Sequence, residues 1–276
     1  MQIRFQNSPE ETKRMSTQEL RSNFLLDELM EDDHLHLIYS HYDRVIVGAV
    51  KPVTKKNELE NHPELRAEYF LERREIGIIN VGGNGVVEAD GEVHTLNKLD
   101  CLYLGKGTKQ VQFQSNDKKN PALYFLLSAP AHQSYANRKL SKEEAAPVSI
   151  GETTTANQRT IYKYIHADGI KSCQLVMGLT VLNNGSVWNT MPAHTHTRRM
   201  EAYFYFDIPE QQRVFHFMGE PMETRHLLVA NHQAVISPPW SIHAGAGTSN
   251  YSFIWGMAGE NYTFTDMDGV SIANLR

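Results

Sequence analysis

The 276-residue sequence has few cysteines and no long apolar run. No segment approaches the roughly 20 apolar residues of a membrane-spanning helix, and residues 1–20 lack the apolar core of a secretory signal. We therefore expect a cytoplasmic protein with no membrane partner. Cys101 and Cys173 are the only cysteines, and in a reducing compartment we expect both to remain thiols.

The sequence also lacks an excess of basic charge. Its 27 lysine and arginine residues are outnumbered by 32 aspartate and glutamate residues, which gives a formal net charge of -5. A nucleic-acid-binding surface needs a basic patch that neutralises phosphates. The charge balance therefore argues against a nucleic-acid partner.

Helical periodicity is scarce. Only residues 12–30 show it, with Leu20, Phe24, Leu25 and Leu29 on one face, and there we expect a short amino-terminal helix. Short β-rich runs separated by Gly, Asn, Asp and Pro fill most of the remainder, which predicts a mainly β protein of antiparallel sheets or barrels.

A polar segment over residues 137–160 interrupts these runs and is expected to connect two halves. The predicted domains are therefore residues 1–150 and residues 151–276. Both halves contain a series of short strands, so two similar β units are expected.

The segment MPAHTHTRRMEAYFYFD holds the strongest chemical pattern. His194 and His196 are two residues apart, so on a strand they point to one face with α-carbons roughly 6.5 Å apart. A turn through TRRM would start the next strand near Glu201, and the segment SPPWSIHAGAG supplies His243. Three imidazoles and one carboxylate predict a divalent metal site, with Zn²⁺ as first choice and Fe²⁺, Mn²⁺, Co²⁺ or Ni²⁺ as alternatives.

The amino-terminal half lacks an equivalent ligand set. His34 and His36 form a second His-x-His pair, but no glutamate follows at a comparable spacing, and only His94 is available in the later strands of that half. One metal ion per chain is therefore expected, in the second half. Other histidines, such as His166 and His216, are expected to be solvated or hydrogen-bonded rather than catalytic.

The ligand pattern resembles the two cupin motifs, and longer strings resemble one family more closely. NTMPAHTHTRRMEAYFYFD, ETRHLLVANHQAVISPPWSIHAGAGTSNYSFIWGMAGEN, FTDMD and HYDRVIVGAVKP are similar to the 5-keto-4-deoxyuronate isomerase family. The resemblance spans both halves. It implies two cupin-type antiparallel β-barrel (jelly-roll) halves, a hexameric assembly, and zinc in the second barrel held by His194, His196, Glu201 and His243.

The resemblance also implies an activity. Members convert the keto-uronate 5-dehydro-4-deoxy-D-glucuronate to 3-deoxy-D-glycero-2,5-hexodiulosonate during breakdown of pectin or other uronate polymers. Such an aldose-ketose isomerisation passes through an enediolate that a metal ion can stabilise.

A ketol-isomerase also needs a base that moves the proton and a cation that binds the substrate carboxylate. The candidates for the base are Glu260, Tyr262, His226 and Tyr203. The candidates for substrate binding are Arg198, Arg225 and Trp240. Arg199 is expected to belong to a solvated hairpin.

Two alternatives remain open at the level of sequence. The same ligand types could hold Fe²⁺ in a cupin dioxygenase, because open positions on such an ion bind oxygen. A cupin that binds a uronate without catalysis is the second alternative, since one fold can carry unrelated functions.

Overall fold

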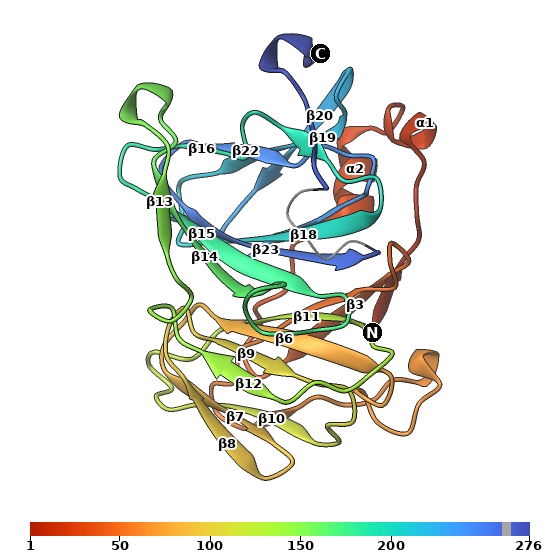
Figure 1. Ribbon diagram of the computed structural model, residues 1–276, viewed down its shortest axis with the longest axis vertical. Coiled ribbons are helices and arrows are strands. Elements are labelled where there is room, and N and C mark those ends of the chain that lie inside the picture. The colour runs from red at the N-terminus through yellow and green to blue at the C-terminus, as the bar shows by residue number, and fades with distance from the viewer. Residues whose placement is uncertain (261–265) are drawn as a thin grey trace. The chain divides into compact units, whose positions relative to one another are not determined.

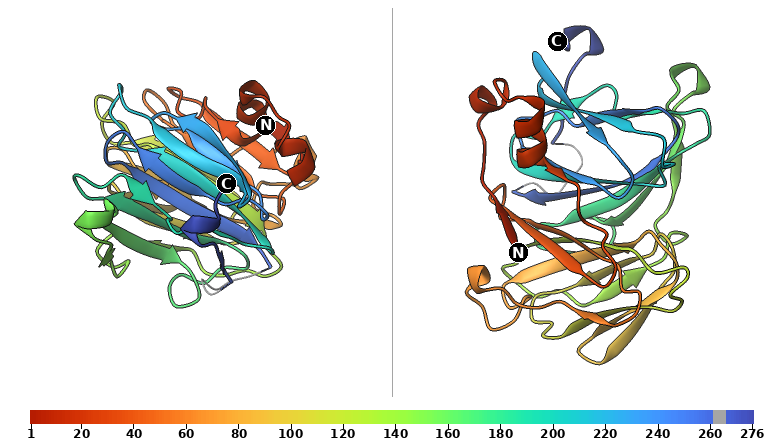
Figure 2. Two further views of the ribbon diagram at one scale, coloured as in Figure 1. Left: turned by 90° about the horizontal axis from the view of Figure 1, so that it is seen from above. Right: turned by 180° about the vertical axis from the view of Figure 1, so that it is seen from behind.

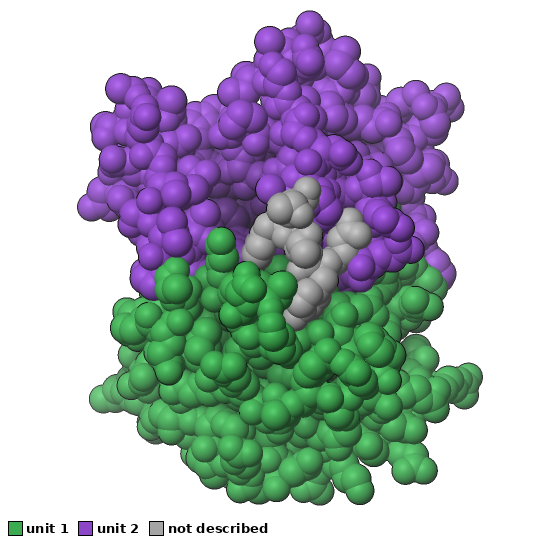
Figure 3. All heavy atoms as spheres, in the orientation of Figure 1, with its two compact units in different colours: residues 1–4, 28–146, 163–177 green, residues 5–27, 147–162, 178–276 purple. Residues whose placement is uncertain are grey.

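The computed structural model describes residues 1–260 and 266–276. Over these residues the chain forms two compact units, coloured separately in Figure 3: unit 1 comprises residues 1–4, 28–146 and 163–177, and unit 2 comprises residues 5–27, 147–162 and 178–276. The units thus differ from the continuous segments 1–150 and 151–276 that the sequence suggests. Residues 5–27 and 163–177 each belong to the unit formed mainly by the other half of the chain.

Unit 1 contains a seven-stranded and a four-stranded sheet (Figure 1). The first has the order β1 (Gln2–Arg4), β3 (Leu35–Ser40), β4 (Ile46–Val50), β11 (Tyr124–Pro130), β6 (Arg74–Asn80), β9 (Cys101–Leu104) and β12 (Arg138–Leu140). The second has the order β5 (Asn57–Glu58), β10 (Val111–Ser115), β7 (Gly85–Ala89) and β8 (Glu92–Leu96). Every pairing in these sheets is antiparallel apart from that of β1 with β3.

Apolar side chains from both sheets fill the interior of unit 1. Ile76 and Ile78 on β6 belong to the same buried cluster as Val87 on β7 and Phe113 on β10. Their alternation along each strand directs every second side chain inward. The interior of unit 1 is therefore a conventional hydrophobic core.

Unit 2 repeats this arrangement. Its seven-stranded sheet has the order β13 (Val148–Ile150), β14 (Arg159–Ile165), β15 (Val176–Leu182), β23 (Ser252–Gly259), β18 (Arg199–Phe206), β21 (Ala234–Ser237) and β2 (Leu25–Leu26). Its four-stranded sheet has the order β16 (Trp188–Asn189), β22 (Ala244–Gly247), β19 (Val214–Glu220) and β20 (Glu223–Val229). A two-stranded ribbon of β17 (His194–Thr195) and β24 (Asp268–Gly269) completes it.

The helices are few and short. They are α1 (Pro9–Thr12) and α2 (Thr17–Phe24), with single 3₁₀ turns η1 (Pro63–Leu65), η2 (Thr153–Thr155) and η3 (Ile272–Asn274). Ser8 and Ser16 each close a capping box, which starts two helices in place of the single helix predicted over residues 12–30. The chain then becomes extended at Leu25 to form β2. Figures 1 and 2 show both helices beside β19 and β20 of unit 2.

The predicted mainly β class is confirmed, but the predicted barrels are not found. Over the described ranges the strands pair within separate sheets, and no sheet closes on itself. The segment 137–160, predicted to be a connector, contains β12, β13 and the start of β14. None of the described helices has the length and apolar content to cross a membrane.

Candidate metal centre

Three pieces of unit 2 bring the four predicted ligands together. His194 lies on β17, which pairs with β24, and His196 follows directly after it. The backbone N–H of His196 donates to the carbonyl of Pro239, which ties this segment to the turn before His243. Glu201 is the third residue of β18. A short strand, the turn after it and the start of the next strand thus bring His194, His196 and Glu201 together.

The ligand atoms converge on one point. His194 Nε2 lies 3.1 Å from His196 Nε2 and 3.0 Å from His243 Nε2. Glu201 Oε2 lies 3.2 Å from His196 Nε2 and 3.0 Å from His243 Nε2. All four ligand atoms lie within 4.8 Å of one another. His196, Glu201 and His243 are buried, and His194 is half-buried.

This donor set fits a divalent cation. Nitrogen and carboxylate ligands lie about 2.0–2.2 Å from Zn²⁺, so two of them at tetrahedral or right angles are about 3.0–3.5 Å apart. Hydrogen bonds alone do not satisfy the four atoms, because a neutral imidazole carries one proton. If His196 and His243 donate from Nε2 to Glu201, neither has an Nε2 proton left for His194. A cation that accepts a lone pair from each atom satisfies the set.

The electrostatics favour the metal-binding protonation states. Burial, reinforced by the neighbouring His243, lowers the pKa of His194 to about 3, so its imidazole is neutral at pH 7. Burial alone would raise the pKa of Glu201, but His243 and His196 hold it well below its usual range. Neutral imidazole and ionised carboxylate are the forms that bind metals.

A buried ion pair supports one of the ligands. Arg199 Nη2 lies 2.6 Å from Asp266 Oδ1, and Arg199 Nε lies 3.3 Å from His196 Nδ1. Asp266 Oδ1 itself lies 3.7 Å from His196 Nδ1. Arg199 is only 1% exposed, so the prediction of a solvated hairpin residue is wrong. Groups that contact the outer nitrogen of a ligand histidine fix the orientation of its ring.

The predicted base candidates lie in different places. The Tyr203 ring lies 5.5 Å from that of His243, and its hydroxyl lies 3.1 Å from Thr190 Oγ1. Glu260 is 69% exposed and pairs with Arg198 at 2.6 Å. His226 is exposed on β20, and its ring lies 5.9 Å from that of Phe215. Tyr262 lies outside the described residues. Of the described candidates, Tyr203 is the one beside the ligand cluster.

The predicted substrate-binding residues do not gather at the cluster. Arg198 is 61% exposed. Arg225 donates from both terminal nitrogens to the backbone carbonyls of Lys13 and Met15. Trp240 is partly buried between β21 and β22. Because its donors already bind two carbonyls, the guanidinium of Arg225 fixes the amino-terminal segment of unit 2.

The sequence does not predict a row of polar side chains inside unit 2. We call this set the polar row; it consists of Asn189, Tyr205, His216 and Tyr251. Asn189 on β16 and His216 on β19 both pair with Gly245 on β22. The Asn189 amide donates to the Tyr251 hydroxyl over 2.6 Å, and the Tyr205 hydroxyl lies 2.7 Å from His216 Nδ1. No local motif marks these residues, because they come from separate strands.

Arg159, at the start of β14, was also missed. It is half-buried, and its Nη1 donates to the Asn157 carbonyl over 2.8 Å. Burial lowers the pKa of its guanidinium, and the nearby hydroxyls of Tyr203 and Tyr251 oppose that shift. Within the described part of the chain no acidic side chain pairs with Arg159.

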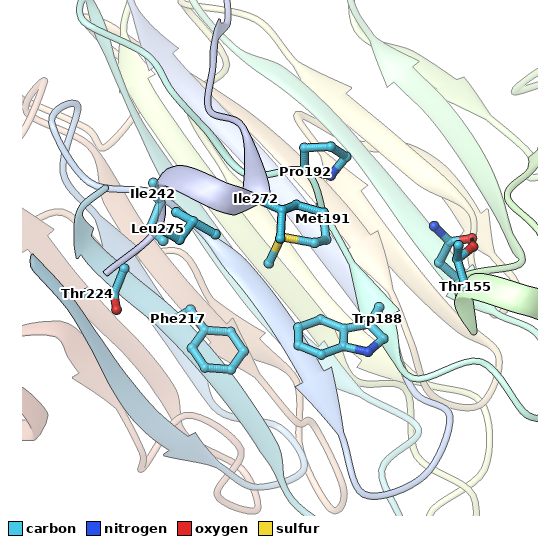
Figure 4. Close-up of a pocket in the computed structure, with 10 residues that line it drawn as sticks. Thr155, Trp188, Met191, Pro192, Phe217, Thr224, Ile242, Ile272 and Leu275 are labelled. Carbon is cyan, nitrogen blue, oxygen red and sulfur yellow. Dashed lines mark hydrogen bonds between the residues drawn. The ribbon is translucent and has the colours of Figure 1, made fainter. Parts of the chain in front are cut away.

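An apolar cavity of about 610 Å³ lies elsewhere on unit 2 (Figure 4). Its walls include Trp188 and Phe217, whose rings are stacked 5.9 Å apart. Trp188 precedes Asn189 on β16 and Phe217 follows His216 on β19, and successive strand residues point to opposite faces. The cavity therefore lies on the outer face of the four-stranded sheet and is separate from the ligand cluster.

Similar proteins were found for the whole chain. A family model described as the KduI/IolB family matches residues 25–271. The 4-deoxy-L-threo-5-hexosulose-uronate ketol-isomerase of Shouchella clausii (strain KSM-K16) is 54% identical over 276 residues, which cover 100% of both chains. The protein of the same name from Formosa agariphila is 55% identical over 273 residues, which cover 99% of this chain and 98% of that one.

A solved structure shares the fold at low identity. The crystal structure of an IolB-like protein from Salmonella typhimurium LT2 matches with a TM-score of 0.74 and 17% identity, covering 90% of this chain and 97% of that chain. At this identity the match bears on the fold alone.

Proposed function

The chain belongs to the KduI/IolB family, and from this premise we propose that it is a 4-deoxy-L-threo-5-hexosulose-uronate ketol-isomerase. The observation that carries the proposal is the identity of 54% over the full length of a relative with that name. The cluster of His194, His196, Glu201 and His243 supports it independently, because a cation held beside the substrate oxygens stabilises an enediolate.

These four residues would hold the ion, one per chain, and we propose zinc as its identity. A bound divalent ion supplies Lewis-acid chemistry, which makes a C–H bond next to a polarised carbonyl more acidic. The interlocking contacts of Arg199 with Asp266 and His196 keep one ligand ring in place.

The isomerisation itself redistributes two protons. The carbon that carries the hydroxyl next to the aldehyde loses its proton, and the aldehyde carbon gains one. The hydroxyl proton is lost as the new ketone forms, and the aldehyde oxygen gains a proton to become a hydroxyl. Burial raises the pKa of Tyr203 well above its usual value, so its hydroxyl stays protonated and suits the role of a hydrogen-bond donor to substrate.

The substrate carboxylate calls for a cation, and Arg159 suits this role better than Arg198 or Arg225. Its guanidinium is half-buried and near Tyr203 and Tyr251, whereas Arg198 pairs with Glu260 and Arg225 binds backbone carbonyls. A planar guanidinium offers two parallel hydrogen bonds to a carboxylate. Arg159→Gln should therefore raise KM by about 10- to 100-fold, since charge-assisted hydrogen bonds contribute about 1.5–3 kcal/mol each.

A direct activity assay tests the proposed function. Purified protein is incubated with the ketoaldehyde derived from an unsaturated uronate, and formation of the 2,5-diketo product is followed by NMR. Activity should disappear with a chelator and return with Zn²⁺. Absence of turnover by metal-loaded protein would reject the proposal, and oxygen consumption would favour a dioxygenase instead.

The finer features implied by the family resemblance belong to the same proposal. They are a cupin-type arrangement in which the amino-terminal half, residues 1–150, carries no metal and residues 151–276 carry one, a homohexamer, a cytoplasmic location and a role in pectin breakdown. Analytical ultracentrifugation tests the hexamer, and metal analysis tests the stoichiometry.

A further inference from the structure

We propose that His216 is a catalytic residue whose neutral imidazole donates a hydrogen bond from Nε2 to a substrate oxygen, an assignment that rests on the ketol-isomerase function proposed above. His216 lies on β19 and is fully buried. The Tyr203 ring lies 5.5 Å from the ring of His216 and 5.5 Å from that of His243. One aromatic ring thus separates His216 from the ligand cluster.

A hydrogen-bond chain fixes which nitrogen of His216 carries the proton. The Asn189 amide donates to the Tyr251 hydroxyl over 2.6 Å. Burial raises the pKa of Tyr205 well above its usual value, so its hydroxyl keeps its proton and can donate it to His216 Nδ1, 2.7 Å away. A neutral imidazole that accepts at Nδ1 carries its proton on Nε2.

The Nε2 atom of His216 has no hydrogen-bond partner among the described residues. This atom is fully buried, and a buried polar atom without a hydrogen bond costs free energy of folding. Asn189 Oδ1, in the same polar row, is also buried and has no hydrogen-bond partner in the described part of the chain. Two unpartnered polar atoms in one row indicate a position where a polar ligand completes the hydrogen bonds.

The protonation state of His216 agrees with this role. Burial, assisted by His243, lowers its pKa to about 3, so the ring is neutral at pH 7. A neutral imidazole N–H is an established electrophile in sugar isomerisation, where it polarises a carbonyl and stabilises the enediolate. The hydrogen bond transfers no proton, so the proton balance of the reaction is unchanged.

Gly245 leaves space for the polar groups of this row. A Cβ atom at this position would lie 2.8 Å from Asn189 Nδ2 and 3.1 Å and 3.3 Å from the hydroxyls of Tyr251 and Tyr205. Any side chain at residue 245 would therefore collide with the polar groups that orient His216. The glycine permits the row to form.

The first test uses kinetics of matched variants. His216→Leu should lower kcat by about 100-fold or more, the usual loss when a preorganised donor to a developing oxyanion is removed. His216→Gln places an amide N–H near the former Nε2 position and should recover a measurable part of that loss. Phe215→Leu, on the outer face of the same strand, is the control and should remain within about twofold of wild type. Metal content and circular dichroism of each variant report whether the cluster and fold persist.

The second test measures the tautomer without activity. In protein with ¹⁵N-labelled histidine, the His216 signals are assigned by their loss in His216→Leu. Long-range ¹H–¹⁵N couplings should show the Nε2–H form in wild type and a population of the Nδ1–H form in Tyr205→Phe. Tyr205 is a positioning residue in this scheme, and its variant should lose part of kcat with KM nearly unchanged.

The outcomes separate the two proposals. Turnover by wild type with full kcat in metal-loaded His216→Leu would overturn the role of His216 and leave the isomerase function standing. An Nδ1–H tautomer in wild type would also overturn it, because Nε2 would then be an acceptor. No turnover by metal-loaded wild type would reject the isomerase function and the role of His216 with it.

Discussion

The two units share a strand order but differ in what fills the interior. In unit 1, Phe113 on β10 pairs with Val87 on β7 and Asn57 on β5. By strand order, β10, β7 and β5 correspond to β22, β19 and β16 of unit 2. The corresponding central residue there is Gly245, which pairs with His216 and Asn189.

The comparison shows how one framework serves two purposes. A phenylalanine and a valine close the interior of unit 1 with apolar contacts, whereas a glycine and a histidine leave polar groups facing inward in unit 2. The seven-stranded sheets differ in the same way. In unit 1, β6 presents the apolar side chains of Ile76 and Ile78, whereas in unit 2, β18 presents Glu201, Tyr203 and Tyr205. The interior of unit 1 therefore contributes stability, whereas the interior of unit 2 provides the candidate functional site.

The largest expected effect comes from removing the charge at the cluster. Glu201→Gln should lower the metal content and reduce kcat by about 1,000-fold or more, because a neutral amide is a far poorer metal ligand than a carboxylate. Metal analysis and the NMR assay measure both effects. His243→Ala should behave in the same way.

Glu75 of unit 1 provides the matched control. It is a fully buried carboxylate that accepts hydrogen bonds from the Tyr103 hydroxyl and from the backbone N–H groups of Cys173, Gln174 and Leu175. Glu75→Gln should destabilise the fold by about 1–3 kcal/mol while the metal content stays at wild-type level. Loss of metal in Glu75→Gln, or full metal content in Glu201→Gln, would contradict the contrast between the units.

The next largest effect concerns the core of unit 1. Phe113→Ala should lower the free energy of unfolding by about 3–5 kcal/mol, because it removes a buried aromatic ring and leaves a cavity. Denaturant titration measures the loss, and kcat of the folded fraction should stay close to wild type. A large fall in kcat at temperatures where the variant is folded would show that unit 1 contributes to catalysis.

Part of the candidate site could be predicted from the sequence. His194, His196 and Glu201 lie within eight residues of one another, so their grouping could be predicted from local spacing. The rest of the site depends on contacts between distant segments: Asp266 reaches Arg199, and His216 meets Tyr205, only in the folded chain.

The surroundings of two arginines also depend on contacts between distant segments. Arg225 resembles a substrate anchor in sequence, but carbonyls more than 200 residues away occupy its guanidinium. Arg199 looks like a hairpin residue, but a carboxylate distant in the chain holds it in the interior. The class of the fold could be predicted from short β runs, whereas the assignment of residues 5–27 and 163–177 to the two units could not, because it depends on contacts between distant segments.

A smaller effect is expected from making the interior of unit 2 more like that of unit 1. Gly245→Ala adds one Cβ atom at 2.8 Å from Asn189 Nδ2 and should displace that amide by a few tenths of an ångström. We expect kcat to fall by about 10-fold, since small misplacements of catalytic groups are costly. Metal content should stay at wild-type level, which separates this variant from Glu201→Gln. Wild-type kcat in Gly245→Ala would show that the row tolerates a side chain.

The smallest effect is expected on the outer face of unit 2. His226 is exposed on β20, where its ring faces Phe215, and Phe215 points away from the interior because it precedes His216 on β19. His226→Ala should therefore change kcat and KM by less than about twofold, and an exposed substitution should shift stability by no more than about 0.5 kcal/mol. Steady-state kinetics of His226→Ala should be measured together with those of His216→Leu. The two histidines lie on neighbouring strands and differ mainly in the face of the sheet that they occupy. A large loss of kcat in His226→Ala would mean that the reaction uses the outer face of this sheet. It would contradict the assignment of the catalytic groups to the interior of unit 2.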